Sequence, residues 1–136
     1  MHIYIQRTGN WYHNGELFFQ AYAGHGEGLN NPAMQNVPST GPLPVGSYTI
    51  CTPLDSDHVG KYAMPLQPAA GNNMHGRSAF YLHGDNPLMN RSASNGCIVK
   101  SPRIARQKVW ESGDHVLHVV AEESDLAQYI TKPITV

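Results

Sequence analysis

Two stretches of the chain decide its fold and carry its chemistry: SAFYLHGDN at residues 78–86 and SASNGCIV at residues 92–99. The first is a short apolar run that ends in His83 and Gly84, which is typical of a β-strand that leaves a sheet. The second places Cys97 between Gly96 and another apolar run, where a loop re-enters the sheet. A cysteine at such a boundary is both fixed in place and reachable, as a nucleophile must be.

The rest of the chain predicts a single, mainly β domain over residues 1–136. The chain holds 13 Gly and 10 Pro and is 14% charged, a turn-rich composition that favours short strands over long helices. Asn14-Gly15 is a strong hairpin signal, and residues 24–44 form a long loop that is functional or covers the core. We expect a curved sheet or sandwich of six or seven strands, including residues 2–6, 16–22, 46–51, 61–67, 78–83 and 115–121, and an extended or irregular tail from Ser124.

One helix is clearly signalled after the second stretch. Ser101 is a suitable N-cap, Pro102 suits the first helical position, and Gly113 follows the predicted end. The spacing of Ile104 and Val109 places both residues on the face that we expect to be buried.

Composition excludes several classes of protein. Nine basic and ten acidic residues, with no basic run, argue against a nucleic-acid partner. No stretch approaches the roughly 18 apolar residues that a membrane span needs, so we expect no membrane insertion. The start of the chain lacks a secretory signal, which predicts synthesis in a cytoplasm. No metal or cofactor is expected, because Cys51 and Cys97 lack metal-ligand spacing and no H-E-x-x-H motif occurs.

The residues alone leave two interpretations of Cys97 open. A buried core cysteine is common beside a strand. A catalytic cysteine needs a thiolate, which an imidazole such as that of His83 supplies by forming an ion pair. Gly96 would let a substrate approach the backbone closely, and its N–H, or that of Cys97, would bind an oxyanion.

The order of these motifs favours catalysis. His-Gly-x-Asn, followed 14 residues after the histidine by the cysteine of Ser-x-Gly-Cys-Ile, resembles the signature of L,D-transpeptidases with a YkuD-type catalytic domain. The resemblance implies that Cys97 is the nucleophile, His83 the base, and the Gly84 carbonyl the group that orients the imidazole. Ser94 and Gly96 match the small residues before the cysteine of that family.

The wider chain resembles a subgroup of short type VI secretion effectors, through Trp11-Tyr12, the loop at residues 24–32 and the run at residues 41–48. That resemblance implies an antibacterial toxin that is secreted and acts in the periplasm of target bacteria. Its substrates would be peptidoglycan tetrapeptide stems, attacked as an L,D-carboxypeptidase or an L,D-transpeptidase that exchanges D-amino acids. It also implies a cognate immunity protein as a partner.

Two departures from the L,D-transpeptidase pattern keep an alternative open. Asn95 replaces a histidine of the family, and Val99 stands where an arginine or asparagine is usual. A substrate carboxylate therefore needs another cation, for which the candidates are Arg91, Arg77 and Lys100. The alternative is a cell-wall-binding domain of the same fold that has lost turnover.

Overall fold

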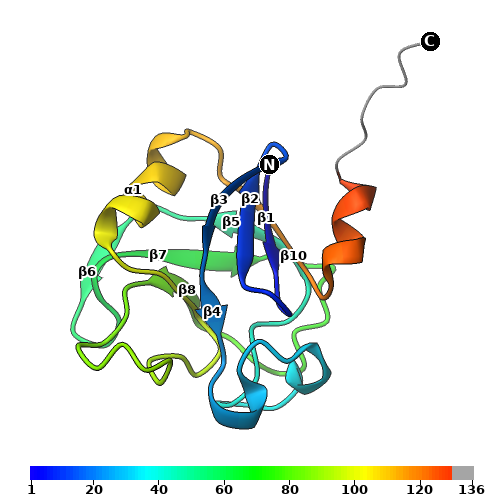
Figure 1. The fold of residues 1–136 in the computed structure, drawn as a ribbon, viewed down its shortest axis with the longest axis horizontal. Coiled ribbons are helices and arrows are strands. Elements are labelled where there is room, and N and C mark those ends of the chain that lie inside the picture. The colour runs from blue at the N-terminus through cyan, green and yellow to red at the C-terminus, as the bar shows by residue number, and fades with distance from the viewer. Residues whose placement is uncertain (130–136) are drawn as a thin grey trace.

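The computed structural model describes residues 1–129 and shows a mainly β domain built on one ten-stranded sheet (Figure 1). The expected fold class is confirmed, with one α-helix among the described residues. The strands run in the order β3-β2-β1-β10-β5-β7-β8-β9-β4, with β6 paired to β7. Their bounds are β1 His2–Ile5, β2 Asn10–His13, β3 Glu16–Gln20, β4 Tyr22–Ala23, β5 Gly46–Ile50, β6 Leu54–Ser56, β7 Gly60–Pro68, β8 Phe80–His83, β9 Ile98–Val99 and β10 Val116–Val120.

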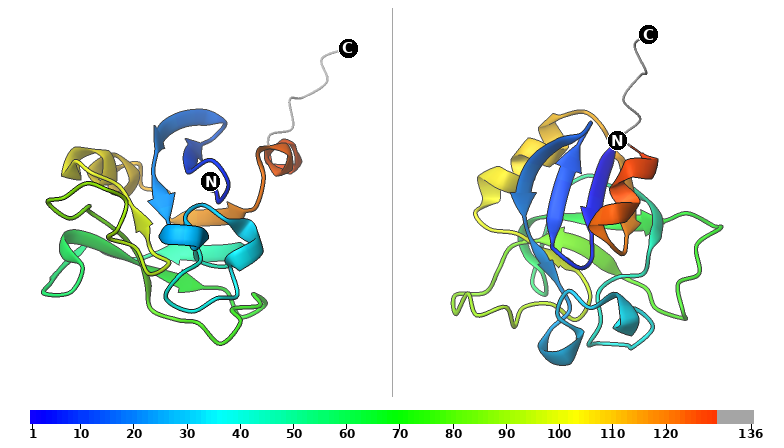
Figure 2. Two further views of the ribbon diagram at one scale, coloured as in Figure 1. Left: turned by 60° about the horizontal axis from the view of Figure 1, so that its bottom comes forward. Right: turned by 45° about the vertical axis from the view of Figure 1, so that its right-hand side comes forward.

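The sheet curls until its two edges almost meet. β3 is one end of the strand order and β4 is the other, yet β3 ends at Gln20 and β4 begins at Tyr22. The views in Figure 2 show the resulting bend, with β1–β3 lying across the core from β7 and β8. Asn14 and Gly15 have φ values of 48° and 85° and form the predicted hairpin turn between β2 and β3.

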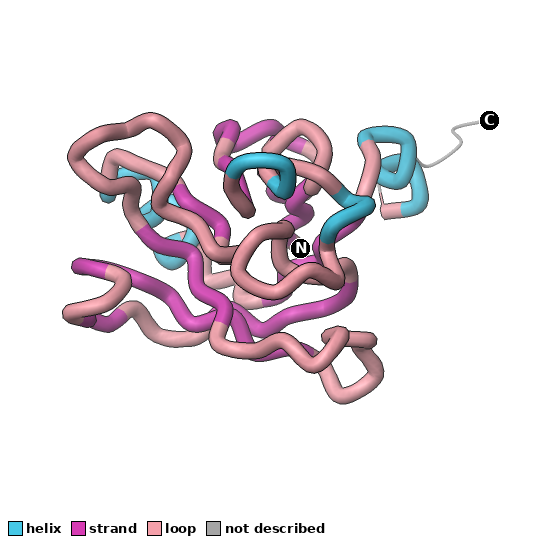
Figure 3. The backbone as a smooth tube through the Cα atoms, turned by 90° about the horizontal axis from the view of Figure 1, so that it is seen from below, coloured by secondary structure: helices cyan, strands magenta, loops and turns pink. Residues whose placement is uncertain are grey.

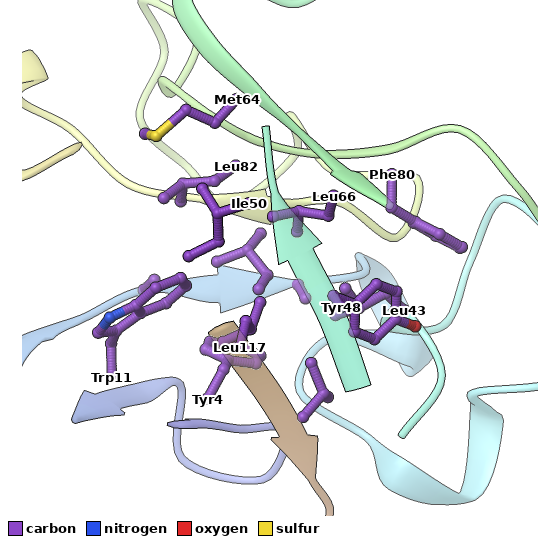
Figure 4. Close-up of a cluster of buried hydrophobic side chains, with 14 of the residues drawn as sticks. Tyr4, Trp11, Leu43, Tyr48, Ile50, Met64, Leu66, Phe80, Leu82 and Leu117 are labelled. Carbon is purple, nitrogen blue, oxygen red and sulfur yellow. The ribbon is translucent and has the colours of Figure 1, made fainter. Parts of the chain in front are cut away.

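The core lies inside this curl and follows from strand alternation (Figure 4). Tyr4 and Trp11, from β1 and β2, pack in the same cluster as Met64 and Leu82, from β7 and β8. All four side chains are fully buried. Successive strand residues point to opposite faces, so the neighbours of a core side chain in a strand point away from the core. This alternation decides which side chains of β8 reach the functional face.

The helix α1, Arg103–Glu111, corrects two details of the prediction. Pro102 occupies the N-cap position, and the Ser101 hydroxyl instead accepts a hydrogen bond from the Asp85 N–H. Ile104 is 70% exposed, whereas Arg106 is buried beside Val109. The buried face of α1 therefore holds a guanidinium that no apolar periodicity could indicate. No helix among residues 1–129 is long and apolar enough to cross a membrane.

The remaining differences concern short elements. β2 and β6 were not expected, and β7 extends over nine residues where the sequence predicted a shorter segment. The long loop carries two 3-10 turns, η1 Gly26–Gly28 and η2 Pro32–Met34 (Figure 3). The tail expected to be extended or irregular from Ser124 instead forms the 3-10 helix η3, Glu123–Gln128, and the part of that prediction beyond residue 129 lies outside the described residues.

Candidate active site

His83 is the last residue of β8 and points away from the core. Phe80 and Leu82 fill the core, so alternation turns His83 to the opposite face, where it is nevertheless only 6% exposed. Its Nδ1 lies 2.7 Å from the Gly84 carbonyl oxygen. A carbonyl only accepts hydrogen bonds, so Nδ1 carries the hydrogen and Nε2 keeps its lone pair. The imidazole is thereby held in the tautomer that a general base requires.

Cys97 lies beside this strand, immediately before β9. β8 and β9 are parallel, with Leu82 opposite Ile98 and His83 opposite Val99. The Tyr81 N–H donates to the Cys97 sulfur over 3.3 Å, and Tyr81 lies two residues before His83. The thiol in turn faces the Ala79 carbonyl at 3.9 Å. Cys97 also lines a cavity of about 230 Å³ with Phe80.

Burial disfavours the charged form of both His83 and Cys97. Burial raises the pKa of the Cys97 thiol, against smaller opposing effects of the Tyr81 N–H, the cysteine's own N–H and the Arg77 charge. Burial likewise lowers the pKa of His83 below its usual 6.5. Both shifts disfavour a charged pair, and no hydrogen bond joins the two side chains in the described structure. The directions of these two shifts favour a neutral thiol and a neutral imidazole over the expected thiolate–imidazolium pair, which stays a prediction.

Ser94 fixes the backbone on either side of the cysteine. Its buried hydroxyl donates to the Cys97 carbonyl at 2.6 Å and accepts from the N–H groups of Gly24 and Gly96, at 2.8 and 3.0 Å. Because the Gly96 N–H is taken by Ser94, it is not free to bind an oxyanion. The Cys97 N–H, which lies against its own sulfur, is the remaining candidate of the two.

Arg77 lies at the cysteine but is held by the backbone. Its guanidinium donates four hydrogen bonds, of 2.7 to 3.1 Å, to the carbonyls of Gln35, Gly41, Pro42 and Asn95. It also stacks over Phe80 at 5.1 Å. The side chain is only 8% exposed, although it lines the cavity of Cys97 together with Asn95. This arrangement ties the long loop to the segment before the nucleophile and leaves little of the guanidinium for a substrate carboxylate.

The other two predicted cations meet in a second, larger cavity. Arg91 and Lys100 line a space of about 470 Å³ that includes neither Cys97 nor His83 among its lining residues. Val99, the register partner of His83, forms part of its wall. The Lys100 ammonium is anchored to the Gln20 carbonyl at 2.9 Å, whereas Arg91 is exposed. Arg7, which sequence reasoning did not select, also lines this cavity, but its guanidinium is paired with the Glu122 carboxylate at 2.9 Å.

The loop between the two motifs is fastened by Tyr22. Its hydroxyl donates to the Asp85 carboxylate at 2.8 Å and accepts from the Ala93 N–H at 3.2 Å. Tyr22 also pairs with Val99 in the β4–β9 ladder. Its two hydrogen bonds therefore attach both ends of the loop between the motifs to β4. Sequence reasoning missed Tyr22, because nothing local connects it with residues more than 60 positions away.

Among the described residues, one group of side chains is close enough to share a metal ion: His2, His13 and Asp114. Their potential ligand atoms lie within 4.8 Å of one another. Both nitrogens of His2 are already used. The Trp11 N–H donates to its Nδ1 at 3.0 Å, and its Nε2 donates to the Asp114 carbonyl at 3.0 Å. A metal on Nε2 would require a hydrogen on Nδ1, which would face the Trp11 N–H. Burial also lowers the pKa of His2 to about 4, which favours the neutral imidazole. The cluster is therefore better explained as a structural hydrogen-bond network around His2 than as a metal site.

Comparison with known proteins gives one match. The family model described as the Tlde1 domain matches residues 18–121. This range contains both motifs and every residue that lines the two cavities, apart from Arg7 and Thr8 of the larger one. No curated protein and no solved structure matches the chain.

Proposed function

Because the chain belongs to the Tlde1 domain family, a family of type VI secretion effectors, we propose that it is a cysteine acyl-transfer enzyme that acts on peptidoglycan stem peptides. The observation that carries the proposal is the hydrogen bond from His83 Nδ1 to the Gly84 carbonyl, beside a cysteine on the adjacent parallel strand. That bond puts the hydrogen on Nδ1 and so leaves the lone pair of Nε2 available to act as a base.

The raised pKa of the Cys97 thiol and the lowered pKa of His83 favour general-base attack over a preformed thiolate. His83 Nε2 takes the Cys97 proton as the sulfur attacks the carbonyl at the L-centre of the diamino acid of a tetrapeptide stem. The Cys97 N–H stabilises the oxyanion. Collapse breaks the C–N bond, the imidazolium gives its proton to the departing D-alanine amine, and a thioester remains. Water then yields a carboxypeptidase reaction, whereas the amine of another amino acid yields transpeptidation or exchange.

The second cavity supports a site for substrate carboxylates. Arg91 and Lys100 bring two cations to a volume that fits an amino acid or short peptide, next to the strand pair of the site. The Lys100 ammonium is fixed by a backbone carbonyl, so its position does not depend on substrate. Arg91, exposed and with a positive φ of 63°, is the cation that we assign to closing on the ligand.

Replacing Arg91 is expected to weaken binding more than chemistry. Arg91→Ala should raise KM for tetrapeptide several-fold with a smaller change in kcat, because the guanidinium contacts the substrate equally in the ground and transition states. Steady-state release of D-alanine measures both constants. Lys108→Ala, which removes an exposed helix cation outside either cavity, should leave both unchanged. An unaltered KM in Arg91→Ala would contradict this assignment.

The periplasm of target bacteria is the proposed place of action, because cross-linked stems lie outside the cytoplasmic membrane. A producing cell exposed to its own kind would need protection, so the proposal includes a cognate immunity protein. No nucleic-acid or membrane partner enters the proposal.

A second candidate is the binding domain without turnover, favoured by the raised pKa of the Cys97 thiol. Mass analysis of peptidoglycan fragments separates the two functions. Incubation of purified protein with tetrapeptide-containing fragments should shorten them by one alanine, or exchange that alanine when another D-amino acid is supplied. Fragments that bind but keep their mass would support the binding domain and refute the enzyme.

A further inference from the structure

We propose that Arg106 is a positioning residue for His83, acting through Gly84 and Lys100; the proposal deepens the proposed function and rests on it. Arg106 lies in the middle of α1 and does not line the cavity of Cys97. It is an arginine that the resemblance to L,D-transpeptidases did not select. It nevertheless contacts Gly84 and Lys100, the two residues whose backbone bonds to His83.

The guanidinium of Arg106 is buried and held by three backbone carbonyls. It is 4% exposed and donates to the carbonyls of Lys61, Tyr62 and Lys100 at 2.9, 3.0 and 2.7 Å. Lys61 and Tyr62 belong to β7, whereas Lys100 directly follows β9. Arg106 therefore joins α1 to both the strand on one side of β8 and the strand on the other.

Gly84 packs directly on this guanidinium. A Cβ at Gly84 would lie 3.0 Å from Nη1 and 3.3 Å from Cζ of Arg106, which is tighter than ordinary van der Waals contact. The Gly84 carbonyl is the acceptor for His83 Nδ1. The Lys100 N–H donates to the His83 carbonyl at 2.8 Å, and the Lys100 carbonyl accepts from Arg106. One side chain thus packs on Gly84, which holds the imidazole, and bonds to Lys100, which holds the His83 carbonyl.

The Arg106 charge also acts on the imidazole itself. Burial is the main cause of the lowered pKa of His83, and the Arg106 charge lowers it further. The Gly84 carbonyl and the Asp85 carboxylate act in the opposite direction. Removing the guanidinium should therefore protonate His83 at a higher pH, while a structural loss elsewhere in α1 would not.

The test is the pKa of the His83 imidazole, followed by NMR in the full chain carrying labelled histidine. Arg106→Gln should raise that pKa toward 6.5, and Arg106→Lys, which keeps the charge, should raise it less. Arg103→Gln removes an exposed charge from the same helix and should leave it unchanged. Equal pKa values in Arg106→Gln and Arg103→Gln would overturn the proposal.

Gly84→Ala keeps the test decisive if Arg106→Gln does not fold, because it displaces the guanidinium without removing it. We expect a changed Nδ1–H signal and a kcat lowered roughly 10- to 100-fold with KM little altered. An unchanged Nδ1–H signal in folded Gly84→Ala would overturn the proposal. The NMR measurement needs no turnover, so positioning of His83 is tested even where the proposed chemistry fails.

Discussion

Cys97→Ala is expected to abolish the release of D-alanine from tetrapeptide stems while the protein stays folded. The change removes the only proposed nucleophile, so no thioester can form and no other group can replace it. The sulfur is half-buried and accepts one backbone N–H, so the cost to folding should be small, about 1 kcal/mol. Thermal unfolding and D-alanine release, measured on the same preparation, separate loss of chemistry from loss of structure.

Cys51→Ala is the matched control for that loss. Cys51 is the other free cysteine among the described residues, is also half-buried, and has its sulfur 3.6 Å from the Thr49 carbonyl, outside the Cys97 cavity. Its replacement should keep full activity. Activity lost in Cys51→Ala and retained in Cys97→Ala would contradict the assignment of the nucleophile.

His83→Ala should be nearly as damaging as loss of the cysteine. The thiol has a raised pKa, so without the imidazole base it stays protonated and the departing amine lacks its acid. Combining His83→Ala with Cys97→Ala should cost little more than either change alone, because the two groups act as one unit. Additive losses would indicate two independent roles.

Sequence reasoning succeeded where the determinants are local. The Asn14-Gly15 turn needs two neighbouring residues that tolerate positive φ, and the structure has that turn. The Gly84 carbonyl lies at His83 because the two residues are adjacent in the chain. The apolar run at residues 78–83 also predicted a strand that ends at His83, and β8 ends at that residue.

Sequence reasoning failed for side chains that bond to backbone groups distant in the chain. Arg77 and Arg106 appear in the sequence as ordinary charges, which belong in solvent or on a substrate. In the fold each is buried and donates to backbone carbonyls: Arg77 to those of the long loop and of Asn95, Arg106 to those of β7 and of Lys100 after β9. The spacing of residues does not predict which backbone carbonyls lack a backbone hydrogen-bond partner. That depends on where strands distant in the sequence stop pairing with one another. For the same reason the buried face of α1 was assigned to Ile104 instead of Arg106.

Export into the periplasm is expected to make the protein toxic, whereas expression in the cytoplasm is expected to be tolerated. The proposed substrate, the tetrapeptide stem, is exposed outside the cytoplasmic membrane, so the same folded chain meets it only after export. Fusion to a cleavable secretory signal should therefore stop growth or deform cells of a Gram-negative host. Colony counts and cell shape after induction measure the effect.

The exported Cys97→Ala protein separates enzymatic damage from the stress of secretion. It has nearly the same surface and size, so a burden on the export machinery would affect both forms equally. Only the wild type should stop growth, and stems recovered from those cells should lack their terminal alanine. A wild-type protein that is folded and present in the periplasm, yet harmless, would refute the toxin. Equal killing by Cys97→Ala would instead assign toxicity to wall binding, as the catalytically inactive alternative requires.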